Sequence, residues 1–359
     1  MKNNNIFEFA TKELSLDAFI CWCINWLNYP QDDLYSLALE LFGLFGVDAS
    51  KENKIEIKQQ FKKVDILAIL PAANKIIIIE DKTFSSEHDE QIRRYKEEIQ
   101  NIGSTILDSI TADDILTVYF KIGFFYDSDR YVRDRVADKS VDAEMFLHLL
   151  KKYMGKSEIL DDYVDYLERL CEWYVTYGDF CGKDEEKGRY ISSEYIAQYK
   201  FMKYVFANRV WDMETSKYRI KSGTNQGGRP WTEMNIIVDR HFRDSTDTYH
   251  VFWRVDTDKN GIYLSFRFYE WMDKKNAIVV KRHREEYIRL KGILENIVRS
   301  GEYIFTWESI SEKDKGKYNE ASFLRIGLEE YLDKWEELGK EFSRNINEVT
   351  DKFFLNEID

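Results

Sequence analysis

Apolar residues recur at helical spacing in two stretches near the start of the chain. The first stretch predicts a helix that ends at Pro30 or in its turn. The second predicts a helix that begins near residue 34 and that Gly46 is well placed to terminate. The apolar positions are, in chain order, Phe19, Trp22, Cys23, Trp26, Leu27, Leu34, Leu37, Ala38, Leu41, Phe42 and Phe45.

Short apolar runs that are typical of strands come next. Residues 55–61, 64–70 and 76–82 predict three strands, the first two with little turn between them. A helix is expected over about 86–100, and residues 115–126, rich in Val, Tyr, Ile and Phe, predict a fourth strand. The predicted order is therefore helix, three strands, helix, strand.

The rest of the chain is helical from 141 to 177 and then alternates strands with helices. Strands are expected over 231–238, 249–255, 261–271 and 303–307, and helices over 193–211, 281–299 and 321–354. Asn260-Gly261 is a strong hairpin signal between two of these strands. The glycine-rich segment 221–230 predicts a loop.

The length of 359 residues favours two domains. We expect an α/β domain over 1–150 and a helical connection over 151–190. Residues 191–359 are expected to form an α+β domain with an antiparallel sheet.

The strongest chemical signal lies where the third predicted strand ends. Four isoleucines lead into Glu80-Asp81-Lys82. Residues two apart on a strand share a face, so Glu80 and Lys82 should stand side by side. The preceding strand carries one acid, Asp65. If the two strands pair, Asp65, Glu80 and Lys82 converge into a site suited to a hard divalent cation and an activated water.

These residues and a following helix motif resemble the PD-(D/E)xK nuclease superfamily. Within it, the chain is similar to the RecB-like branch, whose helix carries a Gln-x-x-x-Tyr motif. The resemblance covers roughly residues 14–126 and implies a restriction-endonuclease-like α/β core. Val64 stands where the superfamily's name places a proline, a departure that is common among its members. The motif residues, in the superfamily's order and spacing, are Asp65, Glu80, Lys82, Gln91 and Tyr95.

The resemblance implies a metal-dependent nuclease whose catalytic residues are these five, within residues 1–150. Mg²⁺ is the expected cofactor, with Mn²⁺ as a substitute. Asp65 and Glu80 would bind it together with the backbone carbonyl of Asp81. Lys82 would orient or deprotonate the attacking water, or stabilise charge on the phosphate, and these roles stay open.

An additional acid on the helix before the first strand sometimes joins the metal in such nucleases. Glu40 is the candidate here, although simple exposure fits its position equally well. Glu13 is expected near the N-terminus of the first helix, where negative charge is favoured. His88 is expected in a loop or at a helix cap.

Charge is unevenly distributed. The net charge of −13 argues against a protein that grips nucleic acid over its whole surface. Residues 1–150 hold 17 Lys and Arg against 26 Asp and Glu, whereas residues 216–292 hold 16 against 10. Either the basic stretch contacts nucleic acid or its charges form a solvated face. The candidate nucleic-acid-binding residues are Arg94, Lys221, Arg229, Lys281, Arg282 and Arg284.

The expected partner is nucleic acid, most simply DNA, while a homodimer and a separately encoded activator stay open. No 18-residue apolar run and no apolar leader is present, so we expect a cytoplasmic protein without a membrane partner. The resemblance suggests restriction, phage defence or repair. The alternative is a catalytically inactive nuclease fold whose C-terminal domain reads a ligand or partner; the complete motif set speaks against it.

Overall fold

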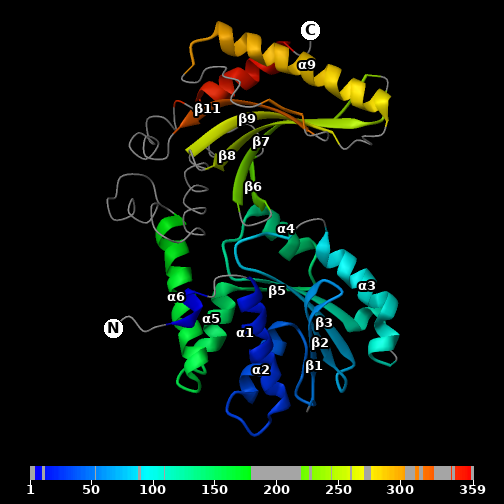
Figure 1. The fold of residues 1–359 in the computed structure, drawn as a ribbon, viewed down its shortest axis with the longest axis vertical. Coiled ribbons are helices and arrows are strands. Elements are labelled where there is room, and N and C mark those ends of the chain that lie inside the picture. Colours follow the sequence, from blue (N-terminus) through cyan, green and yellow to red (C-terminus); the bar gives the residue numbers. More distant parts are fainter. Residues whose placement is uncertain are drawn as a thin grey trace. The chain divides into compact units, whose positions relative to one another are not determined.

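The structure is a computed structural model in which the chain forms two compact units, Met1–Thr176 and Tyr177–Asp359. Figure 1 shows both units. The described residues are 5–9, 13–52, 54–87, 90–108, 110–178, 220–225, 229–243, 245–258, 261–270, 276–303, 312–314, 318–326, 341 and 344–356.

The first unit is built on a mixed five-stranded sheet in the order β1-β2-β3-β4-β5. β1, β2 and β3 are antiparallel neighbours, and β4 and β5 run parallel to β3. The predicted order of helix, three strands, helix and strand is confirmed, and the short strand β5 comes in addition. The strands are β1 (Glu56–Phe61), β2 (Val64–Leu70), β3 (Lys75–Lys82), β4 (Ile115–Lys121) and β5 (Lys139–Asp142).

Helices cover both faces of this sheet (Figure 1). Among the described residues, no helix combines the length and apolar character needed to cross a membrane. The helices are α1 (Glu13–Asn25), α2 (Tyr35–Leu44), α3 (Gln91–Ile106), α4 (Asp127–Arg135), α5 (Ala143–Lys151) and α6 (Glu158–Gly178), with short 3-10 turns at Ile6–Glu8, Trp26–Asn28 and Ala112–Asp114.

Strand β3 is buried on both faces, which explains its nearly continuous apolar sequence. Ile77 and Ile79 pack into the core that α1, α2, α5 and α6 share, whereas Ile76 and Ile78 pack against α3. Side chains alternate along a strand, so Glu80 and Lys82 face α3 and Asp81 faces α1. This alternation sets the geometry of the site at the end of β3.

Helix α6 belongs to the core of the first unit. Leu167 is fully buried in the same cluster as the α1 residues. The ring of Tyr163 stacks on Phe19 with centroids 3.7 Å apart, and Phe7 meets Tyr163 edge-on at 4.8 Å. A stretch that the sequence suggests as a connection therefore completes the first unit, and the boundary between the units falls at 176 and 177.

The second unit contains a six-stranded antiparallel sheet in the order β10-β11-β9-β8-β7-β6, as the α+β expectation requires. Helix α9 (Ala277–Ser300) and a helix over 344–356 pack on it. The indole of Trp253 donates to Thr350 at 3.0 Å, and Phe266 meets Phe353. The strands are β6 (Ile220–Asn225), β7 (Arg229–His241), β8 (Thr248–Asp258), β9 (Gly261–Tyr269), β10 (Glu312–Asp314) and β11 (Tyr318–Ile326).

Two local predictions in this unit are wrong. The expected loop at 221–230 contains β6, because pairing with β7 outweighs the weak strand propensity of its Gly, Ser and Asn residues. The expected helix at 321–354 starts as strand β11, paired with β9. The Asn-Gly hairpin signal is confirmed, since Asp258 pairs with Gly261. The helix expected over 193–211, and residues 304–307 of the last expected strand, lie outside the described residues.

The packing of α6 can be tested by substitution. Leu167→Ala should lower the free energy of unfolding by about 2–5 kcal/mol, because it opens a cavity in the core of the first unit. Ile159→Ala on the same helix is the control, since Ile159 is 49% exposed; its cost should stay within about 0.5 kcal/mol. Urea unfolding measures both, and equal costs would contradict the assignment of α6 to this core.

Candidate active site

The antiparallel register of β2 and β3 brings the predicted acids together. Ile66 lies opposite Ile79, so the next pair along the ladder is Asp65 with Glu80. The backbone N–H of Asp81 donates to Oδ2 of Asp65 at 3.3 Å. Strand pairing therefore places a carboxylate from each strand at the same end of the sheet.

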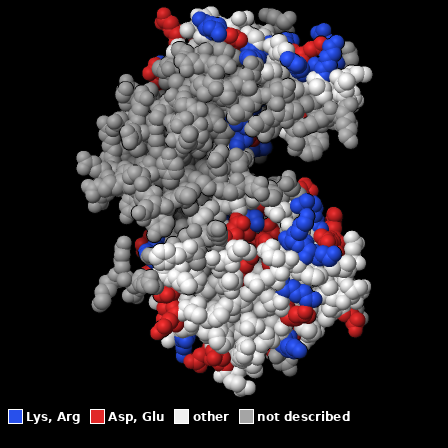
Figure 2. All heavy atoms as spheres, in the orientation of Figure 1, with Lys and Arg blue, Asp and Glu red and all other residues white. Residues whose placement is uncertain are grey.

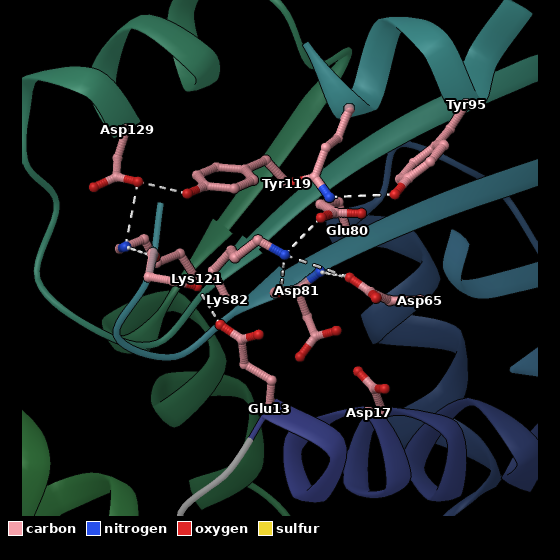
Figure 3. Close-up of polar contacts among 12 residues, drawn as sticks. Glu13, Asp17, Asp65, Glu80, Asp81, Lys82, Tyr95, Tyr119, Lys121 and Asp129 are labelled. Atoms are coloured by element: carbon pink, nitrogen blue, oxygen red, sulfur yellow. Dashed lines mark hydrogen bonds and ion pairs between the residues drawn. The ribbon is translucent and has the colours of Figure 1, made fainter. Parts of the chain in front are cut away.

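The ammonium of Lys82 stands between these groups (Figure 3). Its Nζ lies 2.5 Å from Oε1 of Glu80, 3.0 Å from the backbone oxygen of Asp81 and 3.6 Å from Oδ2 of Asp65. Glu80 is 1% exposed and Lys82 is 5% exposed. Three oxygens from two strands thus surround one buried positive charge.

Burial changes the acid–base properties of this group. It raises the pKa of Glu80 to about 8, although the Lys82 ammonium opposes that rise and the Asp65 carboxylate adds to it. Burial also disfavours the charged form of Lys82, but Glu80 and Asp65 outweigh it and raise the Lys82 pKa above its ordinary value. Oε2 of Glu80 is buried without a hydrogen-bond partner among the described residues.

Helix α3 brings the predicted Gln-x-x-x-Tyr pair to the same place. Nε2 of Gln91 donates to the hydroxyl of Tyr95 at 3.2 Å, as residues four apart on one helical face can do. Tyr95 is buried. This burial is the main cause that raises the pKa of the Tyr95 phenol, and the nearby Glu80 adds to the rise. Arg94, by contrast, is exposed on α3. His88 lies outside the described residues.

The structure does not bring Glu40 to this cluster. Its carboxylate accepts hydrogen bonds from Nζ of Lys152 at 2.6 Å and from the hydroxyl of Tyr153 at 2.8 Å. These two bonds lower the pKa of Glu40. Glu40 thus binds the residues that follow α5 and lies outside the cluster of candidate metal ligands.

Helix α1 contributes an acid that sequence reasoning missed. Asp17 is 2% exposed, and one ligand oxygen from each of Asp17, Asp65 and Asp81 lies within 4.8 Å of the others. Nε2 of Gln60 links Asp17 and Asp65 with contacts of 3.3 Å to each. The available signal was an acid on the apolar face of a predicted helix, between Leu16 and Phe19.

The loop after β3 is fixed by a second buried lysine. Lys121 on β4 lies beside Lys82 in the parallel register. Its ammonium forms a fully buried ion pair with Asp129 at 3.2 Å and donates to the backbone oxygen of Ser85. The hydroxyl of Ser85 donates to Glu13 at the start of α1. Burial lowers the pKa of Lys121, while Asp129 opposes that shift.

The six candidate nucleic-acid-binding residues have different surroundings. In the second unit, Lys281 and Arg284 are exposed on α9, and Lys221 is half-buried on β6. Arg229 begins β7. On the visible face of the first unit, acidic and basic side chains form mixed patches (Figure 2).

Arg282 is engaged in an internal network. Its guanidinium donates to Glu270 at 2.5 Å, pairs with Asp247 at 2.9 Å and lies 4.2 Å from the Phe242 ring centroid. Glu270 is 1% exposed and also contacts His283 at 3.0 Å. These contacts give Arg282 a structural role in the second unit.

The raised pKa of Glu80 predicts a pH dependence of stability. Between the ordinary value of 4.5 and about 8, folded Glu80 holds a proton that unfolded Glu80 releases. Its contribution is therefore complete below pH 4.5 and is lost as the pH rises to about 8. With a metal chelator present, the unfolding free energy of the wild type should fall with rising pH more steeply than that of Glu80→Gln. The difference in slope should reach up to about 1.4 kcal/mol per pH unit. Parallel curves in urea titrations from pH 5 to 8 would contradict this.

The network of Arg282 predicts a stability defect. Arg282→Ala should lower the free energy of unfolding by about 1.5–3 kcal/mol, because it removes the charged hydrogen bond from Arg282 to the buried Glu270 and leaves Glu270 the contact with His283. Arg284→Ala, on the exposed side of the same helix, should change stability by about 0.5 kcal/mol or less. Urea unfolding, with amide hydrogen exchange in β8 and β9 to locate the defect, measures both. Equal stability of the two variants would argue against a structural role for Arg282.

Comparison with known proteins is consistent with this geometry. The sequence model of the PD-(D/E)XK nuclease superfamily matches residues 4–198, more than half of the chain. Searches of curated proteins and of solved structures found no match. The matched region includes Asp65, Glu80 and Lys82. It also includes α3, the helix that carries Gln91 and Tyr95. The chain therefore belongs to the PD-(D/E)XK nuclease superfamily.

Proposed function

We propose that the protein is a Mg²⁺-dependent phosphodiesterase that cleaves DNA. The observation that carries this proposal is the convergence of Asp65, Glu80 and the Asp81 carbonyl on one point, at which Lys82 holds a positive charge. A group of oxygens that stabilises an ammonium in a buried position is electrostatically suited to a cation.

The donor set fits magnesium. Mg²⁺ prefers carboxylate and carbonyl oxygens and keeps several waters, and the buried Oε2 of Glu80 is available as a ligand. Asp65, Glu80 and the backbone carbonyl of Asp81 would hold the ion, and Mn²⁺ can replace it. When bound, the metal supplies charge neutralisation at the phosphate and a water of lowered pKa.

Lys82 is suited to act as a cation, not as a base. Its raised pKa keeps the ammonium charged at neutral pH, because the oxygens of Glu80 and Asp65 that surround it favour the charged form of the lysine. A charged lysine cannot take a proton from water, but it can donate to the attacking water or to a phosphate oxygen. This narrows the three roles that the sequence leaves open to two.

Gln91 and Tyr95 would support Glu80 and contact the substrate. The raised pKa of Tyr95 keeps its phenol neutral, so the hydroxyl remains a hydrogen-bond donor. Their mutual contact supports placing the chain in the branch with the Gln-x-x-x-Tyr motif. Arg94 is exposed one residue before Tyr95 and is available for a phosphate contact.

The choice of DNA rests on the resemblance and on the basic stretch of the second half. Residues 216–292 carry an excess of Lys and Arg within an otherwise acidic chain. The exposed Lys281 and Arg284 are the side chains there that we propose for backbone contacts. Cleavage of foreign or damaged DNA, in defence, restriction or repair, is the role we propose.

Substitution of the site residues tests the activity. Lys82→Ala and Glu80→Gln should each reduce the cleavage rate by about 10²–10⁴-fold, because they remove the donor or metal ligand used at the phosphate. Glu40→Gln is the matched control, since Glu40 binds Lys152 and Tyr153 instead. The rate is measured with Mg²⁺ or Mn²⁺ on linear, circular and single-stranded DNA and on RNA.

Two results would contradict the proposal. Undiminished cleavage by Lys82→Ala and Glu80→Gln would show that the reaction occurs elsewhere. Absence of metal-dependent cleavage on every substrate, with Mg²⁺ bound by the wild type, would favour the alternative of an inactive nuclease fold. Cleavage of RNA without cleavage of DNA would replace the proposed substrate.

A further inference from the structure

The side chain of Asp81 is buried on the face of the sheet opposite Glu80 and Lys82. It is 1% exposed, and neither carboxylate oxygen has a hydrogen-bond partner among the described residues. Figure 3 shows it pointing toward Asp17 on α1. Oδ1 of Asp17 is also buried without a partner there, and its Oδ2 meets the amide of Gln60. Buried carboxylate oxygens from α1 and β3 thus face each other, and few hydrogen-bond donors in the described part of the chain compensate their negative charge.

The charges of the acidic groups around Asp81 are not balanced by the Lys82 ammonium. Asp17, Asp65, Glu80 and Asp81 bring four acidic groups to the end of the sheet, and the Lys82 ammonium forms its ion pairs with the side chains of Asp65 and Glu80. Burying a carboxylate without compensation is costly, so such a group takes up a proton or binds a cation.

The other ionisable groups that the structure describes nearby do not supply the missing charge. The Lys121 ammonium is paired with Asp129. Burial, followed by Asp17 and Asp81, raises the pKa of the Cys21 thiol to about 12, so it remains a neutral side chain at physiological pH. The electrostatics of this face therefore favour either a bound proton or a metal ion.

The spacing of the oxygens fits a metal ion. One oxygen from each of Asp17, Asp65 and Asp81 lies within 4.8 Å of the others. Oxygen ligands of Mg²⁺ or Ca²⁺ lie about 2.0–2.6 Å from the ion, so opposite ligands lie up to about 4–5 Å apart. We propose that Asp17, Asp65 and Asp81 form a second divalent-cation site on the α1 face of the sheet.

The proposed site shares Asp65 with the nuclease site, so the inference rests on the proposed function for that residue. Asp81 would serve both sites, with its backbone carbonyl on one side and its carboxylate on the other. An ion held there would tie α1 to the ends of β2 and β3 and fix the orientation of Asp65. Asp17 and the Asp81 carboxylate are positioning residues in this arrangement.

Counting bound Mn²⁺ on the full-length chain tests the proposal. In equilibrium dialysis or calorimetry at pH 8, the wild type should bind about two Mn²⁺ ions per chain in a saturable manner. Asp81→Asn keeps the backbone carbonyl and should lose one ion, and Asp17→Asn should lose the same ion. Glu80→Gln should lose the other ion, and Glu40→Gln should bind as the wild type does.

Thermal unfolding gives a second readout that is independent of catalysis. In chelator, Asp81→Asn should be at least as stable as the wild type, because it removes an uncompensated buried carboxylate. Mn²⁺ should raise the melting temperature of the wild type more than that of Asp81→Asn. If Asp81→Asn does not fold, the number of bound ions and the melting temperature of Asp17→Asn test the second site instead.

The outcomes separate this site from the nuclease proposal. If Asp81→Asn and Asp17→Asn bind as many ions as the wild type and gain the same melting temperature, the second site is overturned. That result leaves the cleavage test of Lys82→Ala and Glu80→Gln unaffected. Conversely, full cleavage by those two variants would end the nuclease proposal without restoring the ion that Asp81→Asn loses.

Discussion

A buried positive charge, the ammonium of Lys82, organises the end of the first sheet. It lies within hydrogen-bonding distance of Glu80 and of the Asp81 carbonyl, and it pairs with Asp65 across the strand boundary. Without it, the buried Glu80 and the partly exposed Asp65 would lie side by side with no positive charge near them, and their ionisation would cost free energy through desolvation and repulsion. The lysine therefore stabilises the arrangement of acids on which the proposed chemistry depends.

Side chains alternate along β3, so the functional groups at the end of this strand lie on two opposite faces of the sheet. Glu80 and Lys82 face α3 with Gln91 and Tyr95, whereas Asp81 faces α1. One residue can then offer its backbone oxygen to one face and its carboxylate to the other. The isoleucines that precede them are buried on both faces, which holds the strand end in a fixed orientation.

The surroundings of the site are braced by ionic contacts in the first unit. Lys121, Asp129 and Ser85 fix the loop that leaves β3, and Ser85 connects that loop to Glu13. Both β-strand lysines thus hold backbone oxygens at the same end of the sheet. In the second unit, Arg282 plays a comparable part by satisfying the buried Glu270. The sequence alone does not reveal the ion-pair partners of such residues.

The sequence by itself determined the order of elements in the first unit and the convergence of Asp65, Glu80 and Lys82. Local alternation and strand pairing are enough to place those side chains. It did not locate β6 or β11, because residues of weak or mixed strand propensity become strands through pairing with distant partners.

Only the tertiary structure separated Glu40 from the site and brought Asp17 into it. Both acids lie on largely apolar helices near the chain start, and helical periodicity does not state which other elements such a helix packs against. The packing of α1 on the strand ends, and of α2 near Lys152 and Tyr153, decided between them. Such contacts depend on long-range packing, which no local pattern in the chain encodes.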